Sequence, residues 1–274
     1  MVVKEDILHR KGARKASDIP TEVLTLLNQG KIESVNLTEW QAVYHGTLLK
    51  NVLPSIGLEE KLEFILTEVE KQKVETGMKA IRLIGSLLDK VLMDESDIKK
   101  GELIKICAHH VSDSVRCWAA FMNKHNDHSL EEKLLYIRPF AADHHFGVRE
   151  IAWMSIREDL AANIEISVDL LSEWAISEDE NIRRFSLESI RPRGVWTKHI
   201  ELLKEEPQIV LPILNLLKLD PSKYVQDSVG NWLNDASKTQ PEWVVNLCDE
   251  WQKESPTKAT ERIIKKAQRT IVKS

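Results

Sequence analysis

Three carboxylate residues recur at related positions of a repeated sequence pattern. In three similar segments, Glu150 lies two residues after a Val, Glu188 lies six residues after an Ile, and Asp235 lies ten residues after a Val. Asn231 also lies six residues after the Val of its segment. A helix turns about 100° per residue, so steps of four return to nearly the same face. We therefore expect these side chains to line one face of equivalent helices. Carboxylates gathered in this way can stabilise a developing positive charge and can orient or deprotonate a water molecule.

Indoles and cations stand close to these carboxylates in the sequence. Pro192 prevents the helix that carries Glu188 from continuing, so the residues after it leave that helix. Indole faces attract cationic rings and arginines bind phosphates, so the combination fits an anionic backbone that carries a cationic ring. The candidates for base or sugar contact are Trp153, Trp196, Asn231 and Trp232. The candidates for phosphate contact are Arg191, Arg193, Lys198 and Lys238.

The same residues also have purely structural explanations. Three carboxylates on one stripe are also typical of a solvated helix face. Trp153 and Trp232 could belong to the core, because large aromatic side chains dominate burial. Arg149 and Arg183 fit a ladder of contacts between successive repeats. Both explanations stay open at the level of the pattern.

Four similar segments predict the elements that position these side chains. Their aligned pairs are Val115-Arg116, Val148-Arg149, Ile182-Arg183 and Val225-Gln226, in steps of 33, 34 and 43 residues. An amphipathic helix lies between consecutive segments, and a two-helix repeat of this length is typical of an α-solenoid. Asp113, Asp179 and Asp220 precede the second helices as N-caps or turn residues. We therefore predict an all-α superhelix of HEAT-like repeats with a concave groove.

The repeats extend over most of one predicted domain, residues 1–274. We expect an N-terminal helical cap over 1–55, HEAT-like repeats over 56–240 and a C-terminal helix pair over 241–274. Within the first part, helices are predicted over 38–53, 58–73 and 76–93, and a helical segment over 7–28 is interrupted at Pro20.

Composition excludes several classes of protein. No run of 18 apolar residues predicts a membrane span, and the N-terminus does not resemble a secretory signal. Three cysteines at no metal-binding spacing indicate reduced thiols in a cytoplasmic protein. The histidine pairs at 109–110 and 144–145 lack spaced partners, so no metal is expected.

The net charge is -5, yet basic residues gather over 1–17 and 257–274, where they could flank a nucleic-acid path.

Two stretches carry a resemblance to a known family. "NIRRFSLESIRPRGVW" and "YVQDSVGNWLNDASK" resemble the AlkC branch of the HEAT-like DNA alkylation-repair glycosylases, the AlkC/AlkD superfamily. The resemblance is densest over 146–238 and loosely includes "HRKGARKAS" near the N-terminus. It implies excision of cationic N-alkylated purines such as 3-methyladenine from double-stranded DNA, by a monomer and without a cofactor. It also implies that Glu150, Glu188 and Asp235 are the catalytic acids, although Trp232 replaces a histidine of the family.

The sequence is compatible with three functions. The first is a DNA N-glycosylase for alkylated bases. The second is a DNA-structure-binding protein on the same scaffold without catalysis, which the divergent first half and Trp232 favour. The third is a HEAT adaptor for protein partners, which would not bind DNA in a salt-dependent manner.

Overall fold

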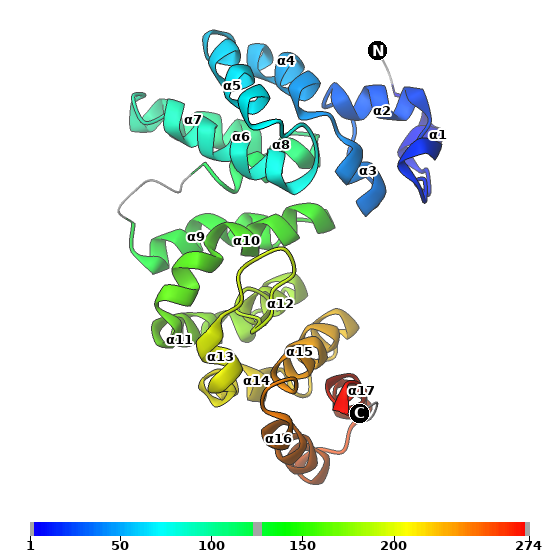
Figure 1. Ribbon diagram of the computed structural model, residues 1–274, viewed down its shortest axis with the longest axis vertical. Coiled ribbons are helices and arrows are strands. Elements are labelled where there is room, and N and C mark those ends of the chain that lie inside the picture. Colours follow the sequence, from blue (N-terminus) through cyan, green and yellow to red (C-terminus); the bar gives the residue numbers. More distant parts are fainter. Residues whose placement is uncertain (1–2, 123–127, 272–274) are drawn as a thin grey trace. The chain divides into compact units, whose positions relative to one another are not determined.

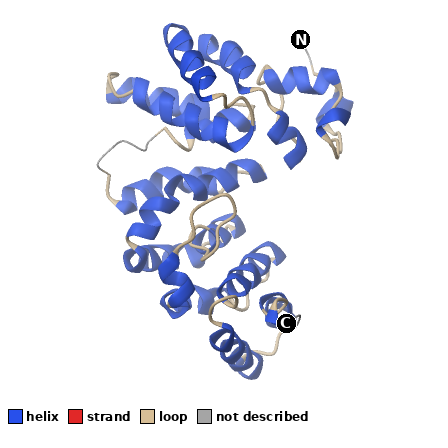
Figure 2. Ribbon diagram, in the orientation of Figure 1, coloured by secondary structure: helices blue, strands red, loops and turns tan. Residues whose placement is uncertain are grey.

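The protein is helical nearly throughout in the computed structural model, which describes residues 3–122 and 128–271 (Figures 1 and 2). The extreme ends of both basic segments lie outside these residues. Within them, seventeen α-helices and two short 3-10 helices form, and one isolated bridge joins Tyr44 to Thr76 without any strand. No helix in these ranges is long and apolar enough to cross a membrane. The all-α prediction is confirmed.

The helices fall into two compact units. The first unit comprises Met1–Asp127 and Asp143–Ser155, and the second comprises His128–Ala142 and Ile156–Ser274. Helix α10, Phe146–Ala162, contributes residues to both. The other helices of unit 1 are α1 (Glu5–Leu8), η1 (Ala16–Asp18), α2 (Thr21–Asn28), α3 (Leu37–Ala42), α4 (His45–Ser55), α5 (Glu59–Gln72), α6 (Gly77–Val91), α7 (Asp97–Ala108) and α8 (Asp113–Ala119). Those of unit 2 are α9 (Leu130–Ala141), α11 (Ile164–Ala175), α12 (Glu180–Glu188), α13 (Glu201–Glu205), η2 (Pro207–Val210), α14 (Leu211–Leu217), α15 (Lys223–Ala236), α16 (Pro241–Glu254) and α17 (Lys258–Ala267).

The aligned residues of the four repeats occupy one structural position. Val115, Val148, Ile182 and Val225 are each the third residue of a helix, in α8, α10, α12 and α15, and each is buried. A buried aliphatic side chain at this point fixes the face that each helix turns toward the core. The repeat register predicted from the sequence is confirmed.

The polar residue after each of these positions caps the preceding turn. Arg116, Arg149 and Arg183 each donate from one guanidinium nitrogen to the backbone carbonyls six and five residues earlier, at 2.7–3.2 Å. Gln226 donates to the carbonyl of Asp220, also six residues earlier, at 2.8 Å. These carbonyls would otherwise lie without partners between two helices, so the contacts of Arg149 and Arg183 are structural. The predicted ladder between repeats is seen for Arg183, which also pairs with Asp220.

Two of these arginines also reach into the turn of the next repeat. Arg116 pairs with Asp143 at 2.8 Å, and Arg183 pairs with Asp220 at 2.6 Å. Asp220 in turn accepts from the backbone amide of Ser222, and Asp179 caps α12 by accepting from the amide of Asn181. The predicted turn and capping roles of these two aspartates are confirmed.

The N-terminal part departs from two predicted helical segments. Within 7–28, α1 ends at Leu8 and no α-helix forms again before Thr21, so the interruption is longer than the one predicted at Pro20. Residues 38–53 form two helices, α3 and α4, because the backbone turns at Val43 and Tyr44. The amide of Tyr44 donates to the side chain of Asn28, and the amide of His45 donates to the carbonyl of Glu75. These long-range bonds satisfy amides that a continuous helix would have used, and no local pattern announces them.

Candidate ion-paired site in unit 2

Glu188 and Asp235 meet at a single arginine. The guanidinium of Arg191 donates to Glu188 Oε1 at 2.8 Å and to Asp235 Oδ2 from two nitrogens at 2.6 and 3.0 Å. Glu188 ends α12, Asp235 lies in the last turn of α15, and Arg191 follows α12 after one irregular turn. The carboxylates are only 4% and 3% exposed. The structure thus brings together two of the three carboxylates proposed from the sequence, with an arginine between them.

Glu188 is held in its ionised form. Burial on its own would raise its pKa, but the charges of Arg184 and Arg191 and a hydrogen bond from Ser228 outweigh burial and lower the pKa below the ordinary value. Ser228 Oγ donates to Glu188 Oε2 at 2.6 Å, and Arg184 lies 3.8 Å from the same oxygen. The pKa of Arg191 is raised because its two carboxylate partners outweigh burial. A fixed anion of this kind can stabilise a neighbouring positive charge without reorganisation.

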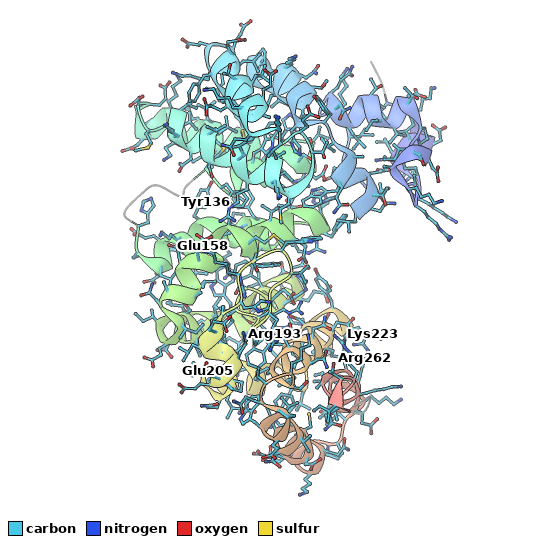
Figure 3. All side chains as sticks on the ribbon, viewed as in Figure 1. Tyr136, Glu158, Arg193, Glu205, Lys223 and Arg262 are labelled. Carbon is cyan, nitrogen blue, oxygen red and sulfur yellow. The ribbon has the colours of Figure 1, made fainter. Side chains whose placement is uncertain are left out.

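Further cations surround Asp235. Lys238 donates to Asp235 Oδ1 at 3.0 Å, and Arg193 donates to the backbone carbonyl of Asp235 at 3.2 Å. Figure 3 labels Arg193 in the loop that follows α12. Asn231, one turn before Asp235, accepts a hydrogen bond from Arg269 at 2.9 Å. Arg191 and Lys238 therefore bind the carboxylate of Asp235 and Arg193 binds its backbone carbonyl, whereas Asn231 joins α15 to Arg269.

The candidate tryptophans differ sharply in exposure. Trp232 is fully buried, and its indole donates to the backbone carbonyl of Ile190 at 3.1 Å. Trp153 is 2% exposed, whereas Trp196 is 53% exposed. Trp232 and Trp153 have the positions of core residues, and a contact of either with a base would require their helices to move. Trp196 is the candidate that a ligand can reach directly.

Glu150 belongs to unit 1, whereas the ion-paired cluster belongs to unit 2. Its carboxylate accepts a hydrogen bond from the indole of Trp153 at 2.9 Å, one helical turn further along α10. This contact orients both side chains on unit 1. The assignment of Glu150 to a common site with Glu188 and Asp235 stays a prediction.

A buried arginine that the sequence did not single out lies beneath the loop that carries Trp196. Arg157, in α10, donates to the carbonyls of Ser189 at 2.8 Å, Arg191 at 2.6 Å and Lys198 at 3.2 Å. Burial, followed by the charge of Arg191, lowers its pKa to about 10. No periodic position of the repeat marks Arg157, so only its long-range contacts reveal it.

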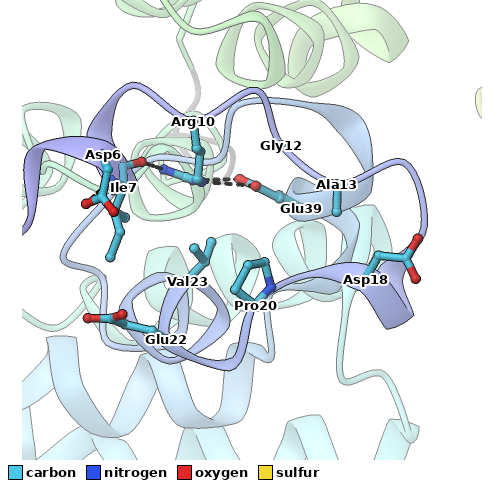
Figure 4. Close-up of a pocket in the computed structure, with 10 residues that line it drawn as sticks. All are labelled: Asp6, Ile7, Arg10, Gly12, Ala13, Asp18, Pro20, Glu22, Val23 and Glu39. Atoms are coloured by element: carbon cyan, nitrogen blue, oxygen red, sulfur yellow. Dashed lines mark hydrogen bonds and ion pairs between the residues drawn. The ribbon is translucent and has the colours of Figure 1, made fainter.

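Unit 1 contains a cavity of about 410 Å³ near the N-terminus (Figure 4). Arg10 crosses it and donates to both oxygens of Glu39 and to the carbonyls of Ile7 and Glu33. These contacts use the guanidinium to tie the N-terminal segment to α3. None of the residues proposed as a site lines this cavity.

No grouping of His, Cys, Asp and Glu within residues 3–122 and 128–271 has the arrangement of a metal site. The cysteines, Cys107, Cys117 and Cys248, are free and buried in helices. Burial raises the pKa of Cys107 to about 12, which makes that thiol unreactive.

Residues 147–266 match the family model described as DNA alkylation repair enzyme. The chain is 41% identical over 119 residues to the uncharacterized protein YhaZ of Bacillus subtilis (strain 168), a match that covers 43% of this chain and 33% of that protein. It therefore spans about a third of the curated relative that it matches.

Two solved structures share the fold. One is the alkylpurine DNA glycosylase AlkC of Pseudomonas fluorescens bound to DNA containing an abasic site analogue, with a TM-score of 0.65, 20% identity and coverage of 96% of this chain and 66% of that chain. The other is AlkD2 of Streptococcus mutans, with a TM-score of 0.57, 24% identity and coverage of 75% of this chain and 96% of that chain. The helical-repeat fold predicted from the sequence is thereby confirmed. Residues 147–266 are therefore similar to the DNA alkylation repair family, and the chain shares the helical-repeat fold of AlkC and AlkD2.

Proposed function

We propose that the protein is a DNA glycosylase that releases cationic N-alkylated purines, such as 3-methyladenine, from double-stranded DNA. The observation that carries the proposal is the pair of carboxylates, Glu188 and Asp235, held on either side of Arg191 within the family-matched segment. No cofactor is part of the proposal.

The chemistry requires a fixed negative charge near a sugar. Alkylation leaves the purine positively charged, so its glycosidic bond is already weakened, and cleavage develops positive charge on the deoxyribose. An ionised carboxylate stabilises that charge and can orient the attacking water. We assign this role to Asp235 or Glu188. Glu150 remains a supporting candidate.

Arg191 links DNA binding to the exposure of these anions. A DNA phosphate competes for the same guanidinium donors that now bind Glu188 and Asp235. If Arg191 turns to a phosphate, Glu188 keeps Ser228 and Arg184, and Asp235 keeps Lys238. The carboxylates would then face the DNA while retaining partners that hold them in place.

The test is release of 3-methyladenine from methylated duplex DNA by the purified protein. We expect the wild type to release the base, and Glu188→Gln and Asp235→Asn to lower the rate at least a hundredfold, the usual loss when one electrostatic group is removed. Both variants should still bind the DNA. Wild-type rates in both variants would remove these carboxylates from the mechanism.

Asp220→Asn provides the matched control. Asp220 is also a buried carboxylate on a bidentate arginine, Arg183, in the same unit, but it holds two repeats together. Its loss should lower stability as the site variants do and leave base release intact. A parallel loss of release in this control would mean that the site variants act through stability alone.

A second candidate function is DNA-structure binding without catalysis. This function is favoured by the ion pairs that Arg191 forms with Glu188 and Asp235 and that Lys238 forms with Asp235. Carboxylates paired in this way are also typical of structural contacts. This reading predicts salt-dependent binding to damaged duplexes and no released base.

A further inference from the structure

The chain between α12 and α13 forms a closed loop over residues 189–200. The amide of Ile200 donates to the carbonyl of Pro192 at 3.0 Å, which joins the two ends of its outer part. Its tip carries Val195 and Trp196, which are 50% and 53% exposed. Two adjacent large apolar side chains are thus presented to solvent on a loop whose base is fixed.

Trp196 has an unusual backbone. Its φ is +61°, in the left-handed region that glycine adopts without penalty and other residues adopt rarely. Such a conformation persists only when the surrounding contacts hold it in place. An indole therefore occupies a position whose backbone conformation favours glycine.

Arg157 supplies the restraint from below. Its guanidinium donates to Ser189 and Arg191 on the incoming side of the loop and to Lys198 on the outgoing side. A Cβ placed on Gly194 would lie 3.0 Å from Arg157 Cζ and 2.2 Å from Thr197 Oγ1, so the loop closes tightly over the arginine. The planar guanidinium is the one side chain that reaches three diverging carbonyls with fixed geometry.

We infer that Arg157 is a positioning residue, which fixes the 189–200 loop so that Trp196 stacks on a DNA base or sugar beside the ion-paired carboxylates. The inference rests on the proposed function for its DNA partner. An exposed indole can stack on any base and attracts a cationic ring more strongly than a neutral one. Arg157 acts on Trp196 through the loop, because its guanidinium donates to three backbone carbonyls of that loop.

The first experiment examines the loop without DNA. Trp196 is the tryptophan most exposed among the described residues, so its signal is the difference in acrylamide quenching and anisotropy decay between the wild type and Trp196→Phe. We expect Arg157→Lys to increase the local motion of Trp196, because one ammonium group cannot span the three carbonyls. Arg183→Lys, which loses comparable carbonyl contacts elsewhere in unit 2, should leave that motion unchanged.

The second experiment uses methylated duplex DNA. We expect Arg157→Lys to raise the KM for base release about tenfold and to change kcat less than twofold, since base stacking contributes about 1–3 kcal/mol and tenfold corresponds to about 1.4 kcal/mol. The KM of the double variant Arg157→Lys/Trp196→Phe should not exceed that of the single variant with the higher KM. Full additivity of the two losses, or unchanged motion of Trp196 in Arg157→Lys, would overturn the inference.

Gly194→Ala keeps the inference testable if Arg157→Lys does not fold. The added methyl group presses on the same guanidinium from the loop side, so it should reproduce the increased motion and the raised KM. If the motion of Trp196 and the KM are unchanged in this variant, Arg157 does not fix the 189–200 loop. If the wild type itself does not bind DNA, the proposed function and the DNA part of this inference both fail, while the motion measured without DNA still decides whether Arg157 fixes the loop.

Discussion

At the scale of single residues, Arg191 determines how the candidate site can work. Its guanidinium satisfies two nearly buried carboxylates that approach from different helices. Without it, Glu188 and Asp235 would bring two negative charges into one poorly solvated region. The same arginine is therefore a structural link in the free protein and a candidate phosphate ligand in the complex.

Trp196 allows function and stability to be separated at one residue. We expect Trp196→Gly to keep the free energy of unfolding within about 1 kcal/mol of the wild type, because relief of the left-handed backbone, about 1–2 kcal/mol, offsets the lost packing. Its affinity for methylated duplex DNA should fall about tenfold if the indole stacks on DNA. Chemical denaturation and a binding titration measure the two quantities.

Lys73 is the matched control for this change. It is the other described residue besides glycine with a left-handed φ, +53°, at the end of α5. Lys73→Gly should gain stability for the same backbone reason and leave DNA affinity unaltered. A large loss of stability in Trp196→Gly alone would show that the indole is mainly a packing residue.

At the scale of helices, the sequence predicts the repeated elements well because their determinants are local. A buried Val or Ile and a polar residue that caps the carbonyl six positions earlier recur in the four aligned helices, and the three arginines also cap the carbonyl five positions earlier. These contacts depend on short separations along the chain, which the repeat pattern reveals. The pairing of Glu188 and Asp235 on nearby helices also followed from their places in the repeat.

What the sequence could not predict depends on contacts between distant segments. The break between α3 and α4 arises from bonds to Asn28 and Glu75, and the loop after α12 depends on Arg157. The repeat pattern likewise does not determine the burial of Trp232, because an indole next to a polar helix face can point to the core or to solvent. In each case the deciding partner lies outside the repeat pattern.

An uncharged histidine of α4 contacts a tryptophan of α8. His45 is fully buried, and its Nδ1 accepts from the indole of Trp118 at 3.2 Å. Burial lowers its pKa from 6.5 to about 3. Below pH 6.5 the unfolded chain takes up a proton that the folded chain does not, so stability should fall as the pH decreases from 6.5 toward 3.

His45→Gln should remove this dependence. At pH 5 the histidine is expected to reduce the free energy of unfolding by about 2 kcal/mol relative to neutral pH, since one pKa unit corresponds to about 1.36 kcal/mol. Urea unfolding at pH 5 and pH 7.5 should therefore show a smaller pH difference in the variant. His9→Gln, at an exposed histidine, is the control; a pH difference equal in His45→Gln and wild type would contradict the assignment.

At the scale of the whole molecule, the net charge of -5 makes the distribution of cations decisive. Many basic side chains form ion pairs with carboxylates, such as Lys218 with Glu254 and Lys266 with Asp227. Lys198 is exposed at the end of the 189–200 loop and is one of the candidate phosphate contacts. DNA affinity should therefore come from a few side chains around this loop and not from a general positive field.

The salt dependence of DNA binding measures how many side chains contact phosphates. We expect Lys198→Ala to reduce the slope of log K against log salt concentration by about 0.9, the value for one phosphate contact. Lys218→Ala, which breaks an ion pair elsewhere in unit 2, should leave the slope unchanged. Equal slopes in the wild type and Lys198→Ala would exclude this lysine from the phosphate contacts.

The two kinds of arginine contact also differ in when they can form. The carbonyl caps made by Arg116, Arg149 and Arg183 span six residues, so each can close as soon as its own turn is in place. The contact of Arg191 with Asp235 spans 44 residues and requires α15 to have docked beside α12. Local closures are fast and distant ones wait for the chain between them. The repeats can therefore assemble early, whereas the carboxylate pair comes together late in folding, and a partly unfolded chain would keep most of its helices after it had lost the arrangement on which repair would depend.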